Sequence, residues 1–298
     1  MNYRDLGRTG LKVSELGLGG LEIGRPWGIR SADDSGQPPP EEEVTRFLNH
    51  LLDQGVNLID TAAAYWASEE RIGKSLKHRR DDYILCSKWG EWCDESGSVY
   101  DYSAKEFWKF LESGLTKLQT DVIDVYQIHS ARMNVLEDAE AISAMKAARD
   151  QGKIRFLGLS CGPDEAVAAM RQGDFDVIQI SYSLLDLHME QQVLPLARDK
   201  NVGVLIKDGL ASGRLTSKID RVGDDQSDLK AKVAGLAELA SSWGMSLPEM
   251  SLRFVLSNPA VSSVIAGTRS ATHLGENMRA ADGQGLTDDQ ISLVRTRL

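Results

Sequence analysis

The feature that most constrains the fold is a regular alternation of short apolar runs and amphipathic stretches along the 298-residue chain. Alternating strands and helices require a parallel sheet. Eight such units in about this length favour a closed barrel, since (β/α)₈ barrels typically take ~250 residues. The apolar runs that we interpret as strands are residues 15–20, 57–60, 83–88, 122–129, 154–160, 175–182, 202–207 and 262–267.

No Pro- or Ser-rich linker separates the strand–helix units, which indicates one continuous domain. Gly55, Gly152 and Gly173 follow helical stretches at the position where glycine commonly ends a helix. The opening segment "RDLGRTGLKVS" indicates a β-hairpin. We therefore predict an α/β fold, a (β/α)₈ TIM barrel over residues 1–298, with an N-terminal β-hairpin and extra helices. A doubly wound sheet is the alternative, but residues 17–24, "GLGGLEIG", do not satisfy G-x-G-x-x-G.

The charge balance narrows the range of partners. A net charge of −10 argues against nucleic acid or an anionic membrane as the main partner. No apolar run approaches the ~20 residues of a membrane span, and the polar first ten residues predict no secretory signal. Cys86, Cys93 and Cys161 lack a metal-type spacing and suggest a reducing compartment, so we expect a cytoplasmic protein.

Polar residues fall where the predicted strands end, which is where such barrels carry their active sites. In "LIDTAAAYWASEER", Asp60 ends the second strand and Tyr65 follows in its loop. Lys88 ends the third strand and His129 ends the fourth. Each residue alone has a purely structural explanation, but their coincidence at neighbouring strand ends indicates a site.

These four residue types suit one kind of chemistry. A tyrosine hydroxyl has an ordinary pKa of about 10, and an ammonium within ~4–6 Å lowers it. A histidine N–H can polarise a carbonyl oxygen, so the group could protonate a developing oxyanion. The four residues include no activated serine or cysteine, and a cofactor hydride is therefore the natural nucleophile.

Over almost its whole length the chain resembles the aldo-keto reductase superfamily. The resemblance lies in "RDLGRTGLKVSELGLGG", "IDTAAAYWASEERIGKSL", "ILCSKWG" and "VYQIHS". It implies that Tyr65 is the general acid and base, that Lys88 and Asp60 tune its pKa, and that His129 orients the substrate.

The resemblance also implies an NADPH/NADP site. Its residues would be Ser160 and Gln179 at the nicotinamide amide, Arg269 at the 2′-phosphate, and Glu276 and Asn277 at the adenine. Two positions depart from the family pattern. Cys161 stands where an asparagine is usual, and Lys207 stands where an aromatic residue usually stacks on the nicotinamide. We expect the stem of Lys207 to lie on the nicotinamide, with its ammonium toward the cofactor phosphates or Asp208.

Four tryptophans, Trp27, Trp66, Trp89 and Trp92, follow the first three predicted strands. We expect them to line the mouth of the site, where indole faces would suit sugar rings or aromatic aldehydes. The Gly- and Pro-rich loop 24–40 is a candidate lid.

The leading hypothesis is an NADPH-dependent reductase of aldehydes or ketones, with a small carbonyl compound or sugar as substrate. An aldose dehydrogenase working oxidatively with NAD⁺ or NADP⁺ is the alternative in the same class. A cofactor-sensing regulatory subunit of membrane channels is a less favoured one. A metal-dependent hydrolase is disfavoured because the five histidines lack a ligand spacing such as H-x-H. The sequence leaves the substrate, the direction of reaction and the oligomeric state open.

Overall fold

A closed barrel of parallel strands forms the centre of the molecule. The computed structural model describes residues 1–25, 39–94 and 97–298. The strands follow one another around the barrel in the order β10-β11-β12-β3-β4-β5-β8-β9, which confirms the predicted fold. Their bounds are β3 (Leu16–Gly19), β4 (Leu58–Asp60), β5 (Ile84–Trp89), β8 (Ile123–Ala131), β9 (Ile154–Cys161), β10 (Val177–Ser181), β11 (Gly203–Lys207) and β12 (Ser263–Gly267).

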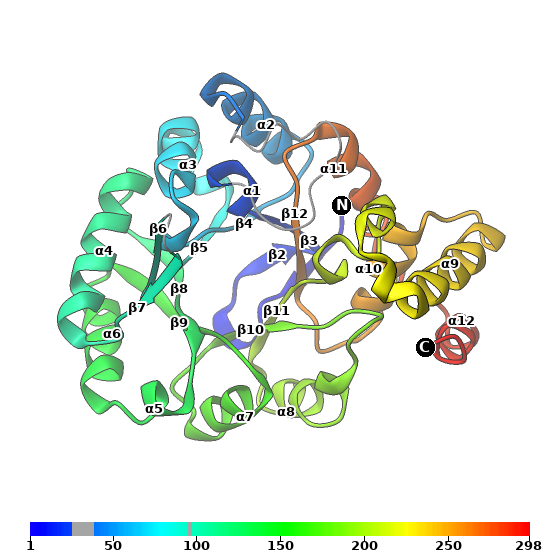
Figure 1. Cartoon of the computed structure of the whole chain (residues 1–298). Helices are drawn as coiled ribbons and strands as arrows, with labels where there is room; N and C mark the ends of the chain where they lie inside the picture. Colours follow the sequence, from blue (N-terminus) through cyan, green and yellow to red (C-terminus); the bar gives the residue numbers. More distant parts are fainter. Residues whose placement is uncertain (26–38, 95–96) are drawn as a thin grey trace.

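Helices cover the outside of the barrel, as Figure 1 shows. Those that follow barrel strands are α1 (Leu21–Gly24), α2 (Glu41–Asp53), α3 (Ser68–Leu76), α4 (Ala104–Leu118), α5 (Met133–Leu136), α6 (Ala139–Asp150), α7 (Pro163–Gln172), α8 (Val193–Asp199) and α11 (Ala271–Met278). Two more, α9 (Ser227–Ser242) and α10 (Leu247–Leu256), lie between β11 and β12, and α12 (Asp288–Arg295) is an extra helix after α11. Gly55, Gly152 and Gly173 have φ values of +86°, +74° and +87°, so the predicted helix-ending glycines adopt the left-handed conformation.

The N-terminal hairpin closes one end of the barrel. Strands β1 (Tyr3–Asp5) and β2 (Lys12–Ser14) pair antiparallel, as predicted. Leu6 and Val13 of this hairpin pack into an apolar cluster with side chains that point into the barrel. The inward members are Leu58, Ile84, Cys86, Val125, Val177, Leu205 and Ile265. This end of the lumen is therefore filled.

A polar layer follows this apolar cluster toward the carboxyl ends of the barrel strands. Successive side chains of a strand alternate between its two faces, so the residue two positions after an inward residue also points inward. Applied to the apolar cluster, this rule gives the next inward residues toward the carboxyl ends of the strands, which are Asp60, Lys88, Gln127, Gln179 and Lys207. The chemistry of the barrel begins at this layer.

A second hairpin, which the sequence analysis did not predict, follows β5. Strands β6 (Glu91–Asp94) and β7 (Gly97–Tyr100) pair antiparallel, with Glu91 opposite Tyr100 and Cys93 opposite Ser98. Directly opposed residues share a face of the hairpin. Glu91, Cys93, Ser98 and Tyr100 therefore lie on one face, and Trp92 lies on the other.

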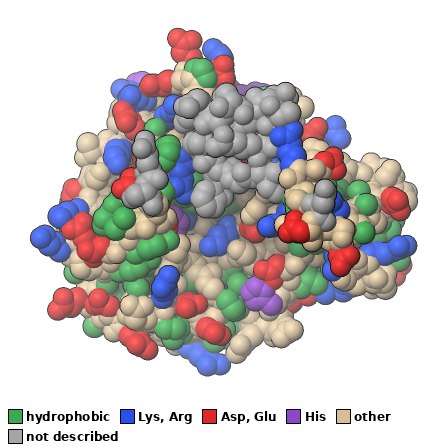
Figure 2. All heavy atoms as spheres, in the orientation of Figure 1, with side chains coloured by type: hydrophobic (Ala, Val, Ile, Leu, Met, Phe, Trp, Pro, Cys, Tyr) green, Lys and Arg blue, Asp and Glu red, His purple; other side chains and the backbone are tan. Residues whose placement is uncertain are grey.

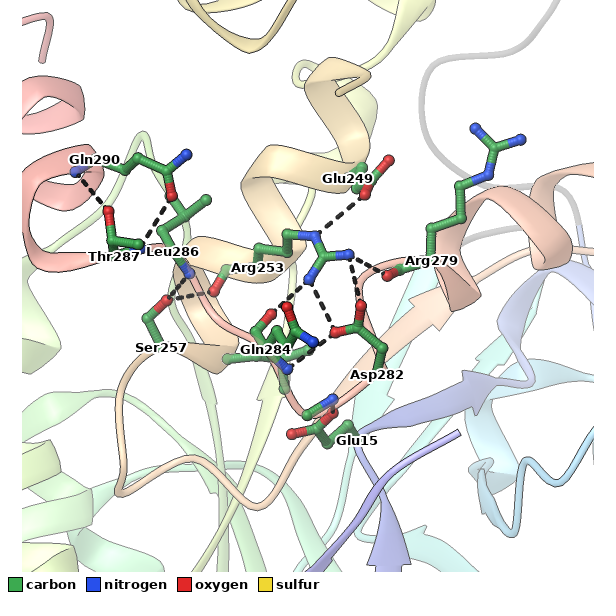
Figure 3. A network of polar contacts seen from close by, with 12 residues as sticks. Glu15, Glu249, Arg253, Ser257, Arg279, Asp282, Gln284, Leu286, Thr287 and Gln290 are labelled. Carbon is green, nitrogen blue, oxygen red and sulfur yellow. Dashed lines mark hydrogen bonds and ion pairs between the residues drawn. The ribbon is translucent and has the colours of Figure 1, made fainter. Parts of the chain in front are cut away.

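Arg253 of α10 ties the C-terminal segment to the barrel (Figure 3). Its guanidinium donates to both carboxylate oxygens of Asp282, at 2.9 and 3.0 Å, and to the carbonyl oxygen of Arg279 at 2.6 Å. The backbone N–H of Gly283 donates to Glu15 Oε2 at 2.9 Å. These contacts fix the end of the segment that carries α11.

Candidate active site

Asp60 and Lys88 form a buried ion pair in the polar layer. Lys88 Nζ lies 2.6 Å from Asp60 Oδ2, and the two side chains are 0% and 5% exposed. The amides of Gln127 and Gln179 both donate to Asp60 Oδ1, at 3.0 and 2.8 Å. The carboxylate thus receives three donors from three different strands, and Lys88 also donates to the Thr61 carbonyl oxygen at 2.9 Å.

Tyr65 stands at the end of a 3₁₀ turn, η2 (Ala63–Tyr65), with Lys88 Nζ 3.5 Å from its hydroxyl. A Cβ at Gly24 of α1 would lie 1.9 Å from the Tyr65 carbonyl oxygen, so this close approach requires glycine. Trp66 then has φ +51° and ψ −110°, a strained conformation of a kind that costs ~1–3 kcal/mol. This turn separates the two aromatic side chains: Tyr65 faces Lys88, and Trp66 is 41% exposed.

The pKa of Tyr65 lies above its ordinary value, whereas the nearby ammonium led us to expect a lowered pKa. Burial raises it above its ordinary value; the Lys88 ammonium lowers it, and the Asp60 carboxylate raises it again. The expected effect of Lys88 is therefore present, but burial outweighs it. Tyr65 holds its proton at neutral pH, which suits a proton donor.

His129 lies beside Tyr65, with the two rings edge to face and their centroids 5.7 Å apart. Burial lowers the pKa of His129 well below its ordinary value, helped by Lys88, Lys207 and Arg25, so the imidazole is neutral near pH 7. Glu91 Oε2 lies 3.0 Å from His129 Nδ1, although the direction is not that of an aligned hydrogen bond.

The expected cofactor residues at the strand ends lie together. Ser160 and Gln179 are direct neighbours in the β9–β10 register and are 1% and 2% exposed. Lys207 Nζ donates to Ser160 Oγ at 3.1 Å. The Asp208 carboxylate accepts a hydrogen bond from Ser212, and the orientation of the Lys207 ammonium toward the cofactor phosphates or Asp208 stays a prediction. Burial, and then Lys88, lower the pKa of Lys207.

The predicted phosphate and adenine residues lie at α11. Arg269 is half-buried just before Ser270, whose hydroxyl accepts the backbone N–H of His273 and caps the helix. Asn277 is buried on this helix, whereas Glu276 is exposed.

Of the three predicted mouth tryptophans that the structure describes, two pack away from the site. Trp89 is 0% exposed and packs on Phe107 of α4, with ring centroids 5.0 Å apart, so its assignment to the substrate pocket is wrong. It follows the inward Lys88 directly, and alternation turns it toward the helix layer. Trp92 lies on the outer face of the β6–β7 hairpin, against Phe110 of α4 at 5.7 Å, so the expectation that it lines the mouth is also wrong. Trp66 is exposed next to Tyr65. Trp27 and residues 26–38 of the candidate lid lie outside the described residues.

Two residues of the site, Gln127 and Glu91, were not predicted from the sequence. Gln127 was detectable, since it lies two residues before His129 on the same inward face. Glu91 was not, because its position depends on a hairpin and on a break in the β8–β9 register between Ile128 and Ala131.

The surface around the site mixes both signs of charge. Figure 2 shows acidic and basic side chains interspersed around this face, without a large basic field. Across the described residues, no helix combines the length and apolar character that crossing a membrane would require. The same residues contain no group of three or more His, Cys, Asp or Glu placed to hold a metal ion.

Comparison with known proteins identifies the family. The profile of the aldo/keto reductase family matches residues 15–296. This chain belongs to the aldo/keto reductase family. An uncharacterized oxidoreductase of Bacillus subtilis, YqkF, is 30% identical over 99% of this chain and 96% of its own length. The L-galactose dehydrogenase of Arabidopsis thaliana is 29% identical over 100% of this chain and 94% of its own length. A solved aldo-keto reductase from Bacillus halodurans, in its holo form, has a TM-score of 0.85 at 28% identity and covers 100% of this chain and 96% of its own. Family membership supports an oxidoreductase that uses a nicotinamide cofactor and acts on small carbonyl compounds.

Proposed function

We propose that this protein is an NADPH-dependent reductase of aldehydes or ketones, with Tyr65 as the proton donor. The observation that carries the proposal is the single ammonium shared by Asp60 and Tyr65: Lys88 Nζ lies 2.6 Å from the carboxylate and 3.5 Å from the hydroxyl. Such a cation stabilises the phenolate that remains after the proton has been transferred.

Each residue of the site has its own role in the proposed reduction. Tyr65 OH donates its proton to the carbonyl oxygen as negative charge develops there, and Lys88 stabilises the resulting phenolate. Asp60, anchored by Gln127 and Gln179, keeps the Lys88 ammonium charged and in place. His129 contacts the reacting oxygen from beside the Tyr65 ring.

The donor set near these residues fits a dinucleotide. Ser160, Gln179 and Lys207 bring hydroxyl, amide and ammonium groups together on three adjacent strands. Arg269 and the capped N-terminus of α11 offer the groups that bind phosphate. When bound, a reduced nicotinamide supplies the hydride. Glu276 and Asn277 are proposed as adenine contacts.

NADPH absorbance provides the decisive assay. We expect it to fall with a panel of aldehydes and ketones in the presence of a chelator. Tyr65→Phe keeps the ring but removes the transferable proton, and should reduce turnover by ~10²–10⁴-fold with cofactor binding retained. Turnover within a few-fold of the unsubstituted protein would reject Tyr65 as the proton donor.

The oxidative direction is a second candidate, favoured by the similarity to an L-galactose dehydrogenase. In that direction, Tyr65 would accept the proton of a sugar hydroxyl with NAD⁺ or NADP⁺ as the oxidant. Running the same panel with aldoses and both oxidised cofactors separates the two candidates, because a preferred direction appears as the larger kcat/KM at matched pH.

A further inference from the structure

The ammonium of Lys207 lies in the barrel mouth with a neutral partner. Its Nζ donates to Ser160 Oγ at 3.1 Å, across β10 from its own strand β11. Asp208, its neighbour in sequence, accepts the Ser212 hydroxyl at 2.8 Å. Across the described residues, no carboxylate forms an ion pair with Lys207. The side chain therefore brings a positive charge into the lumen without a counter-ion of its own.

The carboxylates nearby are engaged elsewhere. Asp60 lies 2.6 Å from Lys88 Nζ, so these two residues form a pair that is neutral as a unit. Glu91 is directed at His129, on the other side of the mouth. Burial, and then the Lys88 ammonium, lower the pKa of Lys207 below its ordinary value, as expected for a cation that lacks a paired anion.

The order of the strands puts Lys207 on the wall that faces the proposed proton donor. The strand before Tyr65, β4, is four strands from β10 in the closed ring of eight, so the two lie on opposite sides of the barrel (Figure 1). Ser160, Gln179 and Lys207 lie on β9, β10 and β11. A hydride donor must reach the carbonyl carbon while Tyr65 contacts the carbonyl oxygen. The ring that donates the hydride is therefore expected against the wall formed by β9, β10 and β11.

The charge of a nicotinamide ring depends on its redox state. The oxidised ring carries one positive charge, and the reduced ring is neutral. A neighbouring ammonium therefore repels only the oxidised form. Inside a protein this repulsion is stronger than in water, because the effective dielectric constant is lower.

We propose that Lys207 discriminates between the two redox forms of the cofactor: its ammonium, held at Ser160, weakens the binding of the oxidised nicotinamide relative to the reduced one. The presence of a nicotinamide here rests on the proposed function. The oxidised cofactor then leaves more readily than the reduced one. A tenfold preference for the reduced form raises the midpoint potential of the bound two-electron couple by about 30 mV.

Titration calorimetry tests this inference without any turnover. The measured quantity is the ratio of the Kd for NADP⁺ to that for NADPH at pH 7 and fixed ionic strength, and the same ratio for NAD⁺ and NADH. Lys207→Met keeps the aliphatic stem and removes the charge, and we expect it to lower both ratios about tenfold, or about 1.4 kcal/mol. Lys207→Arg keeps the charge and should retain most of each ratio. Lys200→Met makes the same change at an exposed position at the end of α8 and should leave both ratios unchanged.

Two results would overturn the inference. Equal weakening of both redox forms in Lys207→Met would mean that the ammonium binds the cofactor phosphates, and unchanged affinities would mean that it lies at the rim. Arg269→Ala provides the reference for a phosphate contact, because it should weaken NADP⁺ and NADPH equally. Lys207→Gln, which is also neutral, replaces Lys207→Met if that variant does not fold.

The titrations also separate this inference from the proposed function. If none of the four dinucleotides binds the unsubstituted protein, the proposed function and the inference fail together. If they bind and the ratios do not depend on Lys207, the inference fails alone.

Discussion

The burial of the Lys88–Asp60 ion pair allows us to predict how much unfolding free energy is lost when either partner is substituted. Both side chains are almost fully inaccessible to water, at 0% and 5% exposure. Removing one partner of a buried pair leaves an uncompensated charge and costs about 3–5 kcal/mol of unfolding free energy. Lys88→Met leaves Asp60 with two amide donors, so we expect about 3 kcal/mol, at the lower end of this range. Asp60→Asn leaves the ammonium with only neutral oxygens, and we expect about 5 kcal/mol.

The double variant isolates the interaction. With both charges removed, no buried ion remains, and we expect a loss smaller than that of Asp60→Asn alone, and therefore far below the sum of about 8 kcal/mol. Urea unfolding at pH 7, followed by far-UV circular dichroism, gives the four free energies, provided that the dependence on urea is equal across variants.

Additive losses, within about 0.5 kcal/mol, would refute this reasoning. They would show that the charges are solvated independently and that Lys88 is not held by Asp60. Activity supplies the contrast: the double variant should regain stability relative to Asp60→Asn without regaining turnover, because Tyr65 still lacks its neighbouring cation.

Three further predictions concern the cofactor, a tryptophan and pH. Arg269→Ala should weaken NADPH binding by about 1.5–3 kcal/mol and leave NADH nearly unchanged; equal losses in titrations with both cofactors would mean a structural role. Trp89→Ala should cost about 3–5 kcal/mol in urea unfolding, because it empties a core position, with KM unchanged in the folded enzyme; a raised KM at unchanged stability would return Trp89 to the pocket. The folded pKa of His129 is lowered, so its contribution to stability is full above the unfolded pKa of about 6.5 and is lost as pH falls below it. His129→Gln should therefore lose less stability than the unsubstituted protein between pH 6.5 and 5, and parallel curves would contradict the shift.

The barrel was predictable because its information is local. Each strand–helix unit carries its own periodicity, and three of the helices are followed by a glycine in the left-handed conformation. Parallel strands joined by helices also allow few arrangements. The helix α12 was missed although a signal was present: Thr287 and Gln290 form a capping box at its start. The β6–β7 hairpin carries weaker signals, because it packs one face on the site and the other on α4.

The prediction for Trp89 was wrong because a position near a strand end does not determine which face of the strand carries the side chain. Lys88 must face the lumen to reach Asp60, so the next residue, Trp89, must face the helices. Direction within a strand is therefore recoverable from sequence once a single inward residue is known. The count does not extend past Gly90, whose φ is +93°, into the hairpin: counted from Lys88, it would place Trp92 inward and Glu91 outward, the reverse of their observed contacts.

The direction of the Tyr65 pKa could not be recovered in this way, since it depends on distances rather than on residue types. Lys88 Nζ is closer to Asp60, at 2.6 Å, than to Tyr65, at 3.5 Å, so the carboxylate offsets much of the field that the ammonium would exert on the phenol. What remains is smaller than the effect of burying the hydroxyl, and the pKa rises. Tyr65 therefore keeps its proton at rest, and Lys88 acts once negative charge forms on the phenolate. A residue list gives the members of such a site, but the sign of the balance among them requires the structure.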